Sequence, residues 1–159
     1  MEVTNSKIEE AAAMEERGRH RTLSTGWQIV LITATILVVG LAVNQLFNLG
    51  FFIGHIWLDN KYQYALFGLL VPLAFLIFPA SDKANKNKVP LYDIAAAGTM
   101  FGLLVFFFFN AELILDSGWE MGAPTHIVVL GFILWALVLE ATRRAGGTAL
   151  FVIVFLISL

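Results

Sequence analysis

A long run without a charged side chain is the feature of this sequence that most constrains its fold. Residues 27–47 contain no Asp, Glu, Lys or Arg and are rich in Ile, Leu and Val. A helix that crosses a bilayer needs about 20 mostly apolar residues, so this run has the length of one complete span. Comparable apolar runs follow at residues 62–80, 91–109, 125–142 and, shorter, 148–159.

These runs predict an all-α integral membrane protein with four transmembrane helices and an incomplete fifth apolar segment, because the last run is too short to cross. The composition agrees with this prediction. Hydrophobic residues make up 58 % of the chain and charged residues only 14 %, and the mean hydropathy is +0.79. Soluble domains carry roughly a quarter charged residues, so this chain has more apolar surface than a compact core could bury.

The distribution of positive charge predicts the orientation in the membrane. When the four runs are threaded through a bilayer, nine of the ten Lys and Arg residues fall on one side and only Lys61 falls on the other. Because an excess of Lys and Arg marks the cytoplasmic side, we expect a cytoplasmic N-terminus. The chain then divides into a cytoplasmic arm (1–26), a four-helix membrane scaffold domain (27–142), and a cytoplasmic turn with the start of a further helix (143–159).

The same composition excludes several kinds of chemistry. The chain has no cysteine, so disulfides, thiolate metal sites and cysteine nucleophiles are impossible. The four predicted spans carry no charge near their midplane, which argues against a proton relay or ion site within this chain. His55 and His126 have no further ligand at metal-binding spacing. We therefore expect no catalytic, cofactor or metal site and no enzymatic activity, and the absence of a basic block argues against nucleic acid as a partner.

Four charged residues near span ends are the candidates for a structural or contact role. Asp93 stands at the start of the third run, where it could cap the helix and interact with its positive dipole end, or contact a partner. Glu140 precedes Arg143 and Arg144 by three and four residues, so the three share one helical face. They could form a local ion pair, or a salt bridge to another part of a larger assembly.

The predicted outer loop at residues 48–62 carries further candidates. It is too short to cross the bilayer and return, so we expect an interfacial segment on the outer leaflet. Phe51, Phe52 and Trp57 would anchor this segment in lipid or contact a periplasmic partner.

Three strings in the middle and end of the chain resemble a known family. They are YALFGLLVPLAFLIFP at 64–79, followed by a Lys-rich loop, VPLYD at 89–93, and LVLEATRRAGG at 137–147. Their order is similar to that in the N-terminal part of fused permeases of TRAP transporters (tripartite ATP-independent periplasmic transporters), of the TAXI-associated type. The resemblance covers about residues 27–159, and LEATRR at 139–144 is its most specific piece.

The resemblance implies a function for the chain as part of a larger machine. It would be the scaffold, or small-subunit-like, part of a secondary transporter in a prokaryotic cytoplasmic (inner) membrane. A large transport subunit or domain, fused C-terminally in this branch, would carry the substrate and ion sites. A periplasmic solute-binding protein would deliver organic acid anions, and an ion gradient would drive import. The alternative is a small structural or interaction protein of the membrane, unrelated to transport.

Overall fold

The computed structural model describes residues 20–47, 49, 59–81, 88–119 and 121–159. Every element in these ranges is an α-helix. Three helices, α2, α4 and α6, are long and apolar enough to cross a membrane. The prediction of an all-helical membrane protein is therefore confirmed at this level. The elements are α2 (Thr25–Phe47), α3 (Asp59–Ile77), α4 (Leu91–Phe109), α5 (Ala111–Asp116) and α6 (Thr125–Ser158).

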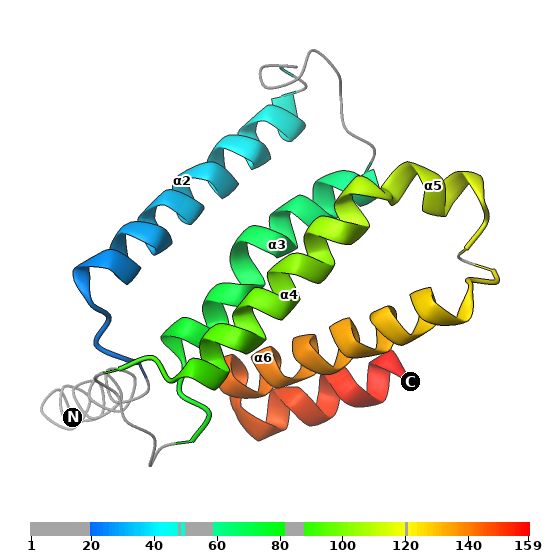
Figure 1. The fold of residues 1–159 in the computed structure, drawn as a ribbon. Helices are drawn as coiled ribbons and strands as arrows, with labels where there is room; N and C mark the ends of the chain where they lie inside the picture. Colours follow the sequence, from blue (N-terminus) through cyan, green and yellow to red (C-terminus); the bar gives the residue numbers. More distant parts are fainter. Residues whose placement is uncertain (1–19, 48, 50–58, 82–87, 120) are drawn as a thin grey trace, which may run out of the picture.

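Helices α3 and α4 form the centre of the molecule. They lie side by side along their lengths, with α2 on one side of this pair and α6 on the other (Figure 1). Phe75 of α3 and Met100 of α4 are completely buried between the helices. In contrast, Ala34 is the one buried residue of α2, whose Ile and Leu side chains remain largely exposed. Such an apolar exterior is what a helix facing lipid requires.

The second predicted run forms α3, with shifted ends. The helix begins at Asp59, three residues before the predicted 62–80 run, and ends at Ile77. Its polar first turn makes α3 less apolar than its neighbours, and it is not among the three membrane-span candidates. Pro79 explains the early end, because a proline disfavours helical geometry in the residue before it.

The short helix α5 was not predicted. It follows α4 after a break at Asn110, whose backbone angles are φ −99° and ψ 7°. Ala111 and Ile114 are buried, and they lie on the same face because residues three apart in a helix do. This small apolar face attaches an otherwise acidic segment to the bundle.

Helix α6 combines the fourth run and the shorter fifth run. Its first part continues past residue 142 as far as the two glycines at 146 and 147. Gly147 has φ 77° and ψ −178°, a conformation that favours glycine, and it interrupts the helix within the segment 143–159 where the sequence predicts a turn. The last part folds back along the first (Figure 1). The indole Nε1 of Trp135 donates a hydrogen bond to Ser158 Oγ at 3.0 Å, and its ring lies 5.7 Å from that of Phe155.

Candidate functional site

One end of the bundle gathers most of the charged side chains that the structure places in contact. The segment before α2, the end of α3, the start of α4 and the break in α6 all meet there (Figure 1). Five residues form this ionic cluster: Arg21, Asp93, Glu140, Arg143 and Arg144. They come from three separate parts of the chain, so the cluster joins elements that are far apart in sequence.

Asp93 is the centre of the ionic cluster. Its carboxylate is completely buried and accepts hydrogen bonds from two arginines, on Oδ2 from Arg21 Nη2 and on Oδ1 from Arg144 Nη1 at 2.6 Å. The expected capping role is not seen: Pro90 is the N-cap of α4, without a side-chain cap bond. Asp93 still lies in the first turn, where the helix dipole favours a negative charge. Its main contacts, however, are tertiary.

Arg21 was not singled out from the sequence. Its backbone N–H donates to the carbonyl of Ile77 at 3.0 Å, and its Nη1 donates to the carbonyl of Phe75, also at 3.0 Å. These bonds fix the chain before α2 against the end of α3. Its buried Nε has no hydrogen-bond partner among the described residues, so the other bonds of the guanidinium hold it in place. The sequence shows Arg21 only as one of several basic residues before the apolar run at 27–47, and no local pattern indicates its contact with Asp93.

Glu140, Arg143 and Arg144 form the local ion pair expected from their spacing. Arg143 Nε and Nη2 each donate to the Glu140 carboxylate at 2.7 Å, and Arg144 Nε donates at 2.8 Å. Both arginines also reach other elements. Arg143 Nη2 donates to the carbonyl of Ala80 at 3.1 Å, and the guanidinium of Arg144 lies 4.9 Å from the ring centre of Phe75.

Because most of the ionic cluster is buried, the loss of one of its ion pairs would cost much free energy. The side chain of Arg144 is 6 % exposed and those of Arg21 and Asp93 are at most 1 % exposed. Ions removed from water lose several kcal/mol of hydration each, so a buried cluster persists only when its members are mutually bonded. Removal of one partner leaves a buried charge uncompensated. The cluster therefore acts as a brace whose members depend on one another.

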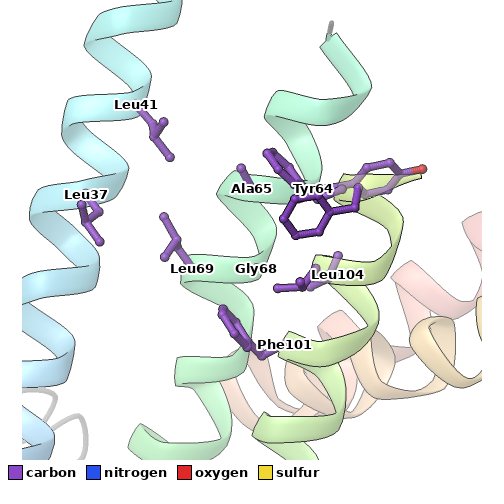
Figure 2. Close-up of a pocket in the computed structure, with 11 residues that line it drawn as sticks. Leu37, Leu41, Tyr64, Ala65, Gly68, Leu69, Phe101 and Leu104 are labelled. Carbon is purple, nitrogen blue, oxygen red and sulfur yellow. The ribbon is translucent and has the colours of Figure 1, made fainter. Parts of the chain in front are cut away.

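A second feature is an apolar crevice between α2 and the α3–α4 pair. A cavity of about 380 Å³ opens between Leu37 on α2, Gly68 on α3 and Phe101 on α4. Figure 2 shows Leu37 and Leu41 on one side and Leu69 and Phe101 on the other. A neighbouring cavity of about 300 Å³ shares Gly68, Leu69 and Phe101 and continues the crevice along α2. The surface that the described residues present to this space is almost entirely apolar, so it suits hydrocarbon.

Other predicted residues lie outside this site. Phe51, Phe52 and Trp57, as well as the arm at 1–19, lie outside the described residues. Within the described ranges, His, Asp and Glu side chains form no group of three that could hold a metal ion. The ionic cluster contains arginines and carboxylates that are paired with one another, an arrangement suited to holding helices together.

Comparisons of the chain with protein-family models, with curated proteins and with solved structures found no match.

Proposed function

We propose that this chain is the membrane scaffold part of a TRAP-type secondary transporter, which imports organic acid anions with an ion gradient and a periplasmic binding protein. In this proposal four helices span a prokaryotic inner membrane, with the N-terminus in the cytoplasm. The transporter family is inferred from the strings at 64–79, 89–93 and 137–147. The scaffold role is inferred from the structure of the ionic cluster.

The observation that carries the scaffold role is the location of the buried charges. Asp93 is completely buried at one end of the bundle, and Arg21 and Arg144 each form an ion pair with it there. The apolar middle of α2 and of α4, and the two apolar parts of α6 at 125–139 and 145–158, carry no Asp, Glu, Lys or Arg side chain. Charged groups along a transport path lie within the membrane and face a cavity. Here they lie at one end of the bundle, where they join the segment before α2, the start of α4 and the break in α6, which supports a static role beside a separate transporting part.

The exposed surface also supports assembly with other membrane helices. Ile32 and Ile36 of α2 are among many large apolar side chains that the chain itself leaves uncovered. In a bilayer, these faces contact either lipid or neighbouring helices. The positive charge at the ionic cluster supports a cytoplasmic location for this end in the proposal.

The test is purification of the protein from its native membranes with an N-terminal tag in mild detergent. We expect either a much larger polypeptide or a co-purified multi-span partner, together with a periplasmic binding protein. Proteoliposomes with the whole assembly should take up organic acid anions, and the 159-residue chain alone should not. An Arg144→Gln variant should reduce assembly, with Lys88→Gln as the matched surface control. A free chain of this size without partners would favour the structural membrane protein, and uptake by the isolated chain would refute the scaffold role.

A further inference from the structure

A polar cavity of about 290 Å³ lies beside the ionic cluster, between the end of α3 and the break in α6. Ser81, Arg143, Arg144 and Thr148 supply its polar side chains, and Gly147 supplies backbone at the turn. The volume corresponds to roughly ten water molecules. Unlike the apolar crevice, this cavity therefore has both the space and the chemistry for a charged ligand.

Two positively charged side chains at the cavity have N–H donors that form no hydrogen bond with the described residues. The printed bonds of Arg143 use Nε and Nη2, and those of Arg144 use Nε and Nη1. Arg143 Nη1 and Arg144 Nη2 donate to no acceptor in the described ranges. The Arg144 side chain is nonetheless only 6 % exposed. Two guanidinium groups that line one cavity with unused N–H donors are arranged to bind an anion.

The charge balance points in the same direction. The ionic cluster contains three guanidinium groups and two carboxylates, so one positive charge is left uncompensated within it. Lys88, exposed just before α4, adds positive charge at the same end of the bundle. Guanidinium groups match phosphate oxygens in geometry and charge, and basic pockets between membrane helices bind anionic headgroups.

We propose that this cavity binds the phosphate of an anionic phospholipid headgroup. The surface beyond Thr148 argues for a lipid rather than free phosphate. Leu150, Ile153 and Ile157 follow on the same helix and are 44–81 % exposed, so they can contact acyl chains while the headgroup occupies the cavity. The inference needs only a membrane-embedded chain and does not depend on a role in transport.

The experiment is a binding titration on the tagged native protein in detergent, followed by native mass spectrometry. The probes are phosphatidylglycerol, phosphatidylcholine and inorganic phosphate. We expect phosphatidylglycerol to bind more tightly than phosphatidylcholine, and inorganic phosphate to bind weakly. Arg143→Gln should weaken phosphatidylglycerol binding roughly fivefold, because it removes one basic side chain at the headgroup. Lys88→Gln, which removes a charge outside the cavity, should change binding less than twofold.

Ser81→Phe is the second variant, because it fills the exposed rim of the cavity without removing an ion-pair partner. It should also weaken phosphatidylglycerol binding if the cavity is the site. Equal binding of both lipids, equal losses in Arg143→Gln and Lys88→Gln, or unchanged binding in both cavity variants would each overturn the proposal. Tight binding of inorganic phosphate would assign the cavity to the free ion instead.

Discussion

The two ends of the α3–α4 pair both carry ion pairs, but these differ in burial. At the end where α4 begins, the buried carboxylate of Asp93 joins the segment before α2 to α6 through two arginines. At the end where α5 follows α4, Lys61 and Glu112 form an ion pair at 3.0 Å, with Glu112 65 % exposed. Between these ends, an apolar crevice separates α2 from α3 and α4 (Figure 2). Ion pairs of similar length therefore differ in how much stability is lost when one partner is removed, because that loss is much larger when the remaining charge is buried.

The sharpest test of this difference exchanges one acid for its amide at each end. Asp93→Asn leaves two arginines with too little negative charge in a buried site and should lower the free energy of unfolding by about 3–5 kcal/mol. Glu112→Gln removes an exposed partner and should cost only about 0–1 kcal/mol. Unfolding in mixed detergent micelles and the amount of protein in membranes would measure both. Equal losses would remove the distinction between the two ends.

A second prediction compares the neighbouring arginines of α6. Arg144→Gln should cost about 3 kcal/mol, because it breaks the long-range bond to the buried Asp93. Arg143→Gln should cost roughly 1 kcal/mol, since its side chain is 38 % exposed and its ion pair is local. The same unfolding assay measures the two variants side by side. A larger effect at Arg143 would show that the tie to Ala80 outweighs the one to Asp93.

The third prediction concerns the turn within α6. Gly147→Ala forces a side chain into a left-handed conformation and should cost about 1–2 kcal/mol. Gly131→Ala, in the first part of the same helix, is the control because an added Cβ meets nothing within 4 Å. Proteolysis near residue 147 and thermal unfolding would report the change. If both variants behaved alike, the backbone reversal at Gly147 would not be essential to the fold.

The smallest effect is expected in the crevice. At Gly68 an added Cβ would lie 3.5 Å from Leu104 Cβ, an ordinary contact distance. Gly68→Ala should therefore leave stability unchanged or raise it by up to about 1 kcal/mol, as expected when a helical glycine is replaced. Thermal unfolding in detergent measures this. A clear loss of stability would indicate that α3 and α4 pack too closely at Gly68 and Leu104 to admit the added methyl group.

Several features followed from the sequence alone because they depend on local geometry. The lengths of the apolar runs predicted α2 and α4 closely, since a helix rises by a fixed amount per residue and lipid requires an apolar exterior. The spacing of Glu140, Arg143 and Arg144 predicted their ion pair, because residues three and four apart share a helical face.

Other features were decided only by the tertiary structure. Arg21 and Asp93 are 72 residues apart, and Asp93 and Arg144 are 51 apart. No local pattern relates such positions, so Asp93 read as a helix-start residue and Arg21 as one of several basic residues before a span. The apolar sequence determined that the chain requires a membrane, whereas the packing of its helices decided which charges are buried together. The physical reason is that hydropathy acts residue by residue, while ion pairing between helices depends on where their ends meet.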